Sequence, residues 1–369
     1  MARIVSDFDM MIDMENESSA VTLSDVAYVS RLTIKWGTIG FIVLFFLRTI
    51  VSLLASILLI LNPPKPPGPT YGFGILPKLT FDQSAFTVSS ISDEIPSSNK
   101  ASITETQLPV YFVPEKKIHL FSNAEANTIA KAFGFLEPSV LDEKTTYTWT
   151  TSQPMHTQLK MDVSTKQFSL TTDWINHLDK FSGQPMQKPQ AIAQLRSTLR
   201  TAEILSPDIA TSEAKTQYLT VQGTEFSPVD NVSDAQFIRV DLFRSSILSR
   251  YPVYRTNPSE GSVWAIFSGA TDNALRILQA SYQLKTVEYD QSETYPILTP
   301  EEAVSRVVRG EGYVAQYSGS TGQGVVRRMF LAYFEENVSQ QYLQPMYVFT
   351  GDDGLVVYLP AVVSTPPKK

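Results

Sequence analysis

The strongest constraint in this sequence is an almost uninterrupted apolar stretch near its N-terminus. Residues 41–61 read FIVLFFLRTIVSLLASILLIL, and 16 of these 21 residues are Phe, Ile, Val or Leu. On a membrane-insertion scale they sum to about −5 to −10 kcal/mol, which outweighs roughly +3 kcal/mol for an arginine at the bilayer centre. At a rise of about 1.5 Å per residue the stretch is about 31 Å long, which matches the hydrocarbon thickness of a bilayer. The sequence therefore predicts one transmembrane helix, within residues 36–61.

A cleaved signal peptide is the competing interpretation of this stretch. Signal peptides have an apolar core of about 7–15 residues close to the N-terminus, followed by a cleavage site with small residues. Here the apolar core is longer, begins after 40 residues and leads into Asn62-Pro-Pro without an A-x-A pattern. These features favour an uncleaved anchor.

The orientation of the helix depends on its basic flanks. Arg31 and Lys35 precede it, and Lys65 and Lys78 follow it, so the positive-inside rule gives a tie. Arg48 lies near the N-terminal end of the stretch and favours a cytoplasmic N-terminus, because its side chain can reach that interface. A chain without cysteine also fits an extracytoplasmic C-terminal domain. The predicted location is thus the cell membrane, in a single pass.

Three polar residues of the apolar stretch share one helix face. Arg48, Ser52 and Ser56 follow one another at intervals of four residues. Small residues at this spacing allow helices to approach closely, and a charge inside a membrane usually faces protein or water. One interpretation is a docking face for a partner helix or a second copy. The other is that the serine hydroxyls donate hydrogen bonds to the backbone of their own helix, while the Arg48 side chain extends to the membrane–water interface.

Composition excludes several classes of chemistry. The 369-residue chain has no cysteine and only three histidines, so thiol nucleophiles, disulfides, zinc-thiolate sites and iron–sulfur clusters are absent. Its net charge is −7 and its basic residues do not cluster, which argues against nucleic acid as a partner. The sequence predicts no cofactor and no metal.

The rest of the chain divides by composition and pattern. Five prolines in residues 63–69 favour an extended polyproline II spacer, although a ligand for a proline-recognition domain is an alternative. A Ser/Thr-rich lead-in follows over residues 87–106. The predicted organisation is an acidic cytoplasmic tail (1–35), a transmembrane helix (36–61), a stalk with its lead-in (62–106) and three modules (107–185, 186–294 and 295–363).

Each predicted module combines one helix with several strands. Two helices are expected at residues 123–133 and 189–205. A third is expected to begin at the capping box Thr299-Pro-Glu-Glu302, to have an apolar stripe that runs to Val308, and to be ended by Gly310. This order indicates an α+β fold in which one helix packs on an antiparallel sheet in each module. The strands are expected at residues 146–150, 157–163, 167–172, 217–222, 236–244, 262–267, 274–289, 313–317, 325–334, 346–349 and 355–359.

The last module resembles a known family. Residues 295–304 (YPILTPEEAV) resemble the helix start of PepSY-type domains, and residues 329–334 and 342–349 resemble their closing strands. The overall plan is similar to that of the YycH/YycI regulators. The match covers about residues 295–360, under a fifth of the chain. The resemblance implies PepSY-like outer units that restrain a sensor histidine kinase, and it offers no catalytic residues.

No catalytic constellation emerges from the sequence. Residues 318–324 (SGSTGQG) are glycine-rich but lack the strand-to-helix setting of a nucleophile elbow or phosphate loop. Residues 351–354 (GDDG) suit a turn between strands better than a calcium loop. Asp173 and His177 have no third ligand in view, and the neighbouring acids Glu335 and Glu336 stand at a strand end and do not form a hydrolytic pair.

These observations together predict a non-catalytic protein of the cell envelope that acts through protein–protein contacts, with a membrane or envelope protein as its partner. A structural envelope protein that self-associates is the first alternative. A hydrolase acting on the cell wall is the remote one, because no acid/base arrangement supports it.

Overall fold

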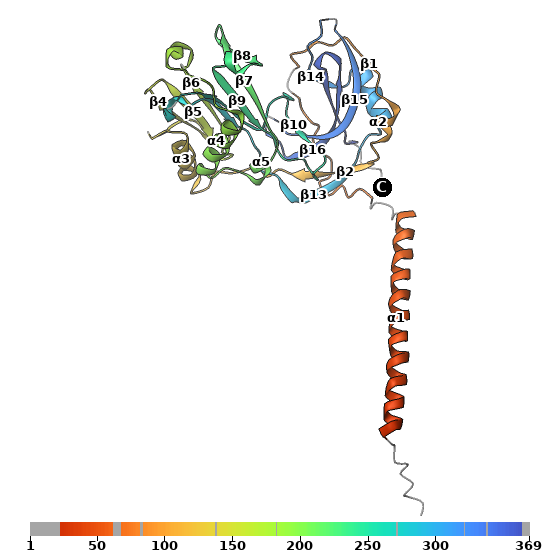
Figure 1. The fold of residues 1–369 in the computed structure, drawn as a ribbon. Coiled ribbons are helices and arrows are strands. Elements are labelled where there is room, and N and C mark those ends of the chain that lie inside the picture. The colour runs from red at the N-terminus through yellow and green to blue at the C-terminus, as the bar shows by residue number, and fades with distance from the viewer. Residues whose placement is uncertain are drawn as a thin grey trace, which may run out of the picture. The chain divides into compact units, whose positions relative to one another are not determined.

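The computed structural model describes residues 23–61, 68–81, 84–136, 139–181, 183–270, 272–320, 322–336 and 339–363. It divides into two compact units, residues 1–68 and residues 69–369. The structure is α+β, with one N-terminal apolar helix and two large sheets (Figure 1). Most of the predicted tail lies outside the described residues.

The first unit contains helix α1 (Leu23–Leu61), which has 39 residues. At about 1.5 Å per residue it is about 58 Å long. The helix starts earlier than the sequence predicted, so residues 23–35 are helical rather than part of a tail. Its segment Ser30–Leu58 is long and apolar enough to cross a membrane, and none of it is buried.

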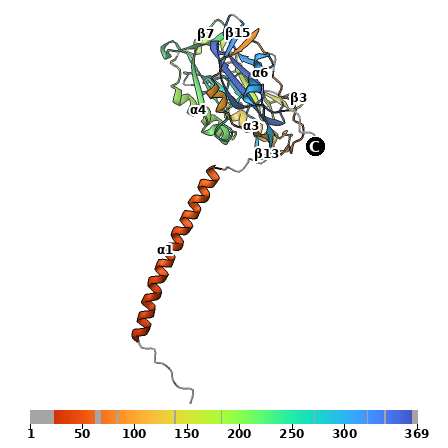
Figure 2. The same ribbon diagram turned by 90° about the vertical axis from the view of Figure 1, so that its right-hand side faces the viewer.

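The second unit contains a nine-stranded antiparallel sheet with the order β3-β4-β5-β6-β12-β11-β9-β7-β8. Helices α3 (Ser122–Ala132) and α4 (Lys188–Thr201) pack against it side by side, as Figure 2 shows. The core between helices and sheet includes Leu195 and Leu199 of α4. The strands are β3 (Val140–Glu143), β4 (Thr146–Thr151), β5 (Thr157–Asp162), β6 (Phe168–Thr172), β7 (Ala214–Gln222), β8 (Glu225–Val229), β9 (Phe237–Leu242), β11 (Val263–Ser268) and β12 (Ile277–Tyr282).

An eight-stranded sheet forms the other part of this unit. Its main path is β1-β15-β16-β17-β14; in addition β2 pairs with β13 and β16, and β10 pairs with β15. Helix α6 (Pro300–Val308) contributes Ala303, Val304 and Val307 to the core of this sheet. The strands are β1 (Ser90–Asp93), β2 (Gln107–Phe112), β10 (Val253–Tyr254), β13 (Glu288–Pro296), β14 (Tyr313–Gln316), β15 (Gln323–Phe334), β16 (Tyr342–Gly351) and β17 (Val356–Pro360).

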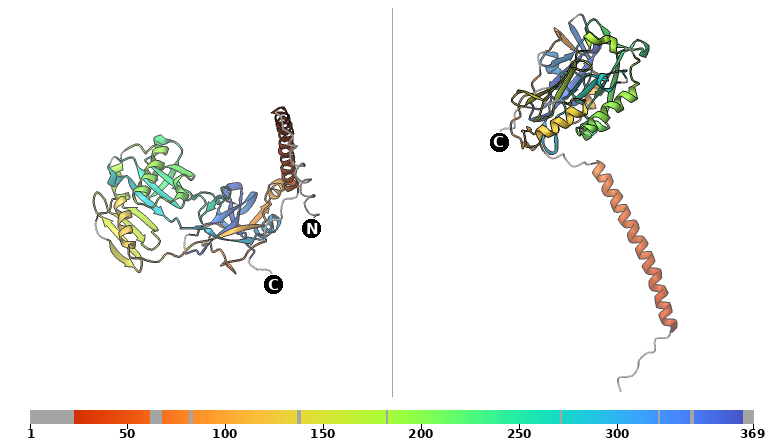
Figure 3. Two further views of the ribbon diagram at one scale, coloured as in Figure 1. Left: turned by 90° about the horizontal axis from the view of Figure 1, so that it is seen from below. Right: turned by 90° about the vertical axis from the view of Figure 1, so that its left-hand side faces the viewer.

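The chain passes between the two sheets four times. It leaves the eight-stranded sheet after β2, returns for β10, leaves again for β11 and β12, and returns finally for β13. The crossings are residues 113–139, 243–252, 255–262 and 283–287. The yellow-to-green elements of one sheet and the blue elements of the other stand apart in Figure 3 (left), joined by these segments.

The predicted stalk and lead-in need correction. Residues 62–67 lie outside the described residues, but from Pro69 the chain packs on the eight-stranded sheet. The Thr70 N–H donates to the Thr294 carbonyl (3.1 Å), and Leu79 and Phe81 enter an apolar cluster with strands of this sheet. The lead-in contains β1, which pairs in parallel with β15, and the short helix α2 (Ser97–Ala101). These residues are part of the fold because their apolar side chains complete its core.

The three predicted helices are present with changed ends. Helix α3 is confirmed within one residue, and Gly134 (φ +92°) ends it. Helix α4 ends at Thr201 rather than at 205, because Glu203 adopts a left-handed conformation (φ +58°). The capping box of α6 is confirmed: the Thr299 hydroxyl accepts the Glu302 N–H, and the Glu302 carboxylate accepts the Thr299 N–H. Val308, predicted to be in the apolar stripe, is 44% exposed.

Most predicted strands are present, but the prediction of one long strand at residues 274–289 is wrong. The segment divides into β12 and the start of β13, which belong to different sheets. Strands of the first two predicted modules share the nine-stranded sheet, whereas β2 of the first module pairs in the other. The module boundaries and the PepSY-like arrangement stay predictions.

Candidate functional site at the junction of the two sheets

A buried ion pair joins the two sheets at the crossings. Arg244 follows β9, Glu335 follows β15, and both side chains are fully buried. Arg244 Nη2 lies 2.6 Å from Glu335 Oε1. Two opposite charges at this distance, shielded from water, interact strongly but cost much desolvation.

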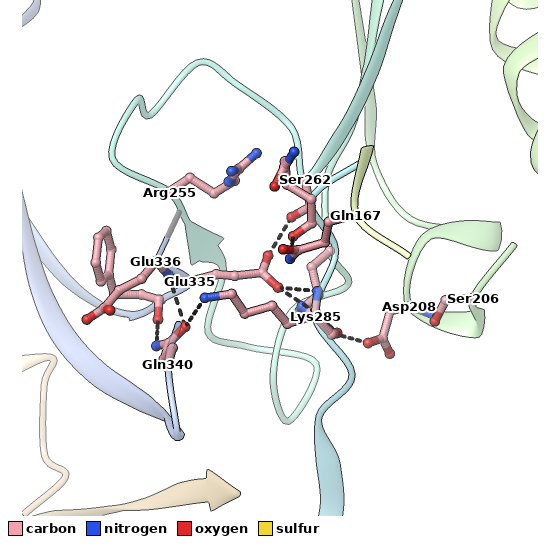
Figure 4. A network of polar contacts seen from close by, with 12 residues as sticks. Gln167, Ser206, Asp208, Arg255, Ser262, Lys285, Glu335, Glu336 and Gln340 are labelled. Carbon is pink, nitrogen blue, oxygen red and sulfur yellow. Dashed lines mark hydrogen bonds and ion pairs between the residues drawn. The ribbon is translucent and has the colours of Figure 1, made fainter. Parts of the chain in front are cut away.

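Glu335 accepts two further hydrogen bonds from the crossing segments. The Ser262 hydroxyl donates to Oε2 (2.6 Å), and the Lys285 backbone N–H donates to Oε1 (3.1 Å), as Figure 4 shows for these residues. Burial alone would raise the pKa of this carboxyl, but Arg244 and the two donors outweigh burial. The pKa of Glu335 therefore lies below its usual value.

Arg244 holds a second acid and a second crossing. Its Nη1 pairs with Asp208 of helix α5 (Pro207–Ala210) and donates to the Tyr289 hydroxyl at 3.2 Å; Tyr289 in turn donates to Asp208. Its Nη2 also donates to the Lys285 carbonyl (2.5 Å). Burial would lower the pKa of Arg244, but these groups and Glu335 raise it above its usual value. Burial raises the pKa of Tyr289 to about 12.

The side chain of Lys285 places a largely buried amine at this junction. Its Nζ donates to Gln340 Oε1 (3.5 Å), and Gln340 Nε2 donates to the carbonyls of Phe334 (2.8 Å) and Tyr342 (2.9 Å). Burial lowers the pKa of Lys285 to about 8, although the carboxylates of Glu335 and Glu336 oppose this effect. About one fifth of this amine is therefore neutral near physiological pH, and most of it stays charged.

A polar cavity of about 380 Å³ adjoins the junction. Its volume is in the range of small-molecule sites in proteins. It contains two lysines, Lys116 from the segment after β2 and Lys285 from the last crossing. The other residues that line it are Val113, Pro114, Glu115, Asp162, Ser164, Thr165, Gln167, Leu284, Thr286, Ser339, Gln340 and Gln341.

The acids at and beside the junction have fixed structural partners. Glu335 is held by Arg244, whereas Glu336 accepts the Thr80 N–H (3.2 Å). Asp162 accepts the hydroxyl of Thr145 and the N–H groups of Ser164 and Thr165. Among the described residues, no three His, Asp or Glu side chains are grouped closely enough to hold a metal ion. The arrangement is suited to bind a polar ligand and to join the sheets.

The residues singled out in the sequence lie elsewhere. Arg48, Ser52 and Ser56 are on α1, where the Ser56 hydroxyl donates to the Ser52 carbonyl of its own helix (2.9 Å). Residues 351–354 form the predicted turn, with Asp353 at φ +52°. Asp173 accepts a hydrogen bond from Asn176 (2.7 Å).

Sequence reasoning missed the junction. Its central partners are 91 residues apart in the chain. The one available signal was a charged residue directly after the apolar end of a strand, at Glu335.

Comparisons with known proteins add little. No protein-family model and no curated protein matches this chain. One solved structure, an uncharacterized protein from Eubacterium rectale, is 13% identical and is similar over 72% of this chain and 86% of its own, with a TM-score of 0.33. A similarity at this level supports no argument about fold or function.

Proposed function

We propose that this protein is a membrane-anchored, non-catalytic interaction or regulatory protein whose 69–369 unit lies outside the cytoplasm. The observation that carries the proposal is helix α1. Its apolar side chains from Phe41 onward are exposed where they are described, and its segment Ser30–Leu58 is long enough to span a bilayer. Exposing these apolar side chains to water would cost much free energy, whereas the hydrocarbon core of a bilayer accommodates them.

The partner is a membrane or envelope protein, met through the 69–369 unit and the Arg48 face of α1. This face combines one charge with Ser52 and Ser56. The bond from Ser56 to its own helix removes the need for a partner at that hydroxyl. Arg48 is therefore the residue whose replacement tests the face.

The test is extraction of the native full-length protein in a mild detergent through a C-terminal tag, followed by identification of the proteins that co-purify. A stoichiometric membrane partner, lost with Arg48→Leu but retained with Ser56→Ala, supports the proposal. Recovery of the same partner with Arg48→Leu assigns the contact to the 69–369 unit. The absence of any stoichiometric partner contradicts an interaction role.

The orientation has its own test. Protease added to intact cells should digest the 69–369 unit, because the N-terminal side of α1 is proposed to be cytoplasmic. Complete protection of that unit in intact cells, with digestion after lysis, would overturn this topology.

Self-association is the second candidate function, and the edge strand β3 favours it. All four of its residues are exposed, including Val140 (69%) and Leu141 (55%). An exposed edge strand with two apolar side chains offers backbone groups for pairing with another copy. A purified homo-oligomer that dissociates when Val140 is replaced by lysine would favour this candidate over a regulatory partner.

A further inference from the structure

The turn that leads into helix α3 carries three apolar side chains on its surface. Residues 116–121 read KKIHLF and lie in the first crossing, between β2 and α3. Ile118 is 51% exposed, Leu120 89% and Phe121 64%. Among the described residues, no other large apolar side chain is as exposed as Leu120. Three such side chains on one turn are typical of a contact surface rather than of scattered surface residues.

The backbone of this turn is closed by its own hydrogen bonds. The His119 N–H donates to the Ser122 hydroxyl (3.0 Å), and the Ser122 N–H donates to the His119 carbonyl (3.0 Å). The Phe121 N–H donates to His119 Nδ1 (3.2 Å), and the Phe121 carbonyl accepts the Glu125 N–H (3.0 Å). Because these polar groups already have partners, they stay satisfied when the turn enters an apolar environment.

The charges around the turn leave only a small positive excess. Lys116 and Lys117 precede it and are exposed, and Glu115 adjoins them. Glu125, in the first turn of α3, pairs with Lys166 at 3.1 Å. The surface therefore offers apolar contact rather than a strong field of one sign, and it suits hydrocarbon better than an anionic ligand.

The length of the chain brings a bilayer within reach of this turn. Only residues 62–68 separate helix α1 from the 69–369 unit, and seven residues span at most about 25 Å. At the start of that unit the Thr70 N–H donates to the Thr294 carbonyl of β13, and β13 pairs with β2. The exposed turn follows β2 in the chain. The strands that lead into the turn are therefore tethered close to the bilayer in which we place α1.

We propose that this turn inserts into the surface of the bilayer that α1 spans, as a second membrane contact of the protein. Leu120 and Phe121 enter the boundary of the acyl chains, while Lys116 and Lys117 keep their ammonium groups at the level of the headgroups. Burial of apolar surface supplies the attraction, so zwitterionic lipid is sufficient. The contact limits rotation of the 69–369 unit about its tether. The inference rests on the membrane anchor of the proposed function, and the experiment separates the two.

Because the chain has no cysteine, a fluorophore can be attached at one introduced cysteine. Leu120→Cys, Val232→Cys and Leu54→Cys are each labelled with the polarity-sensitive dye NBD in the full-length protein and reconstituted in phosphatidylcholine vesicles. Val232 is the control, since it is an exposed apolar residue (43%) that follows β8, the edge of the nine-stranded sheet opposite β3. Leu54 lies in the apolar segment of α1 and reports on the anchor. Phosphatidylcholine with a nitroxide on its acyl chain quenches labels that contact lipid.

The nitroxide lipid should quench the labels at positions 120 and 54 and leave the label at position 232 largely unchanged. Quenching at position 54 without quenching at position 120 would overturn this inference and keep the anchor. Absence of quenching at position 54 would overturn the anchor itself. A blue-shifted emission at position 120 without quenching by lipid, as contact with a second copy would give, also contradicts insertion.

Substitution of Phe121 makes the test specific. Phe121 is the N-cap residue of α3, and serine is favoured at an N-cap, so Phe121→Ser keeps the start of the helix. In the protein labelled at position 120, it should lower the ratio of inserted to free turn about tenfold, because apolar surface is lost. Phe121→Leu should largely retain insertion.

Lys117→Gln is the matched control for this substitution, because it removes a charge from the same turn and leaves its apolar side chains in place. It should change the quenching at position 120 little. Quenching that is unaffected by Phe121→Ser, or that is lost in Lys117→Gln, would overturn the proposal.

Discussion

Buried charges at the junction are stable only as a set. Arg244 and Glu335 are both fully buried. The Glu335 carboxylate accepts three hydrogen bonds, from Arg244, Ser262 and Lys285. The backbone N–H of Glu335 donates a fourth to the Tyr254 carbonyl. Removing one member leaves the other charge without its partner in a dry interior. The cost of such a loss is several times that of breaking an exposed ion pair.

Glu335→Gln should therefore destabilise the protein by about 3 kcal/mol or more, because Arg244 keeps its charge, loses its fully buried counterion and retains only the partly exposed Asp208. The measurement is urea-induced unfolding followed by tryptophan fluorescence. Since the folded-state pKa of Glu335 lies below its usual value of 4.5, its stabilisation is present above that pH and is lost as the pH falls. The variant should lack this part of the acid sensitivity.

The control for this variant is Glu94→Gln, which removes a half-exposed partner of Arg327. It should change the free energy of unfolding little. If the two substitutions lower the free energy of unfolding equally, the buried ion pair of Glu335 contributes no more to stability than the exposed pair of Glu94.

Lys285 should also make stability rise with pH, but in an alkaline window and because its charged form is disfavoured in the folded protein. Its folded-state pKa of about 8 lies below the usual 10.5, so the unfolded chain binds more protons between these values and stability rises with pH across that window. Lys285→Met should flatten the rise between pH 7.5 and 9.5 and stabilise the protein near pH 7 by up to about 2 kcal/mol.

The comparison is made by urea unfolding at several pH values, with exposed Lys144→Met as the control. A wild-type profile of stability against pH that runs parallel to that of Lys285→Met would contradict the lowered pKa of Lys285.

Neither Lys285 nor Glu335 could be assigned its role from sequence, because each depends on partners brought together only by folding. Local patterns identify a residue's own element and carry no information on such partners.

At the scale of elements, local signals predicted what local interactions determine. The capping box at Thr299 and the stop at Gly310 (φ +80°) involve neighbours in sequence, and the structure confirms both. Thr299→Ala should destabilise the protein by about 1 kcal/mol, because the hydroxyl no longer accepts the Glu302 N–H.

Urea unfolding measures this effect, and Thr299→Ser is the control, since it keeps the hydroxyl. If Thr299→Ser and Thr299→Ala lower the free energy of unfolding by the same amount, the hydroxyl cap contributes nothing. The loss of stability then comes from the lost packing of the threonine methyl group.

Elements whose existence depends on tertiary pairing were harder to predict. Strand β1 lies in a Ser/Thr-rich segment without a clear pattern and forms because β15 offers a free edge. Residues 274–289 were predicted as one strand, since strand periodicity does not reveal a change of sheet. Leu284 and Lys285 lie in the connecting segment, where the chain crosses to the other sheet.

On the scale of the whole molecule, the α+β class and the apolar N-terminal helix followed from composition and pattern. The strand order did not, because four crossings interleave the two sheets along the chain. A division into successive modules assumes that neighbours in sequence pair with each other. Here β2 instead pairs with β13 and β16, both more than 170 residues further along.

This arrangement makes residues 69–106 part of the folded unit. Leu79 and Phe81 pack in one apolar cluster, Ile91 and Ile95 in another, and Gln344 Nε2 donates to the Pro77 carbonyl (2.9 Å). Buried aliphatic side chains contribute about 1.5–3 kcal/mol each relative to exposed ones. The segment therefore contributes a share of stability comparable with the net stability of a typical domain.

Two truncated chains test this conclusion. A chain that begins at Pro69 should be soluble without detergent and unfold cooperatively, because it keeps both sheets and every cluster of the core. A chain that begins at Gln107 keeps all three predicted modules but loses β1, α2 and the packing of residues 69–81. It should unfold at much lower urea concentration or fail to fold, as circular dichroism and urea titration measure. Equal stability of the two chains would restore the interpretation of residues 69–106 as a stalk with an extended lead-in.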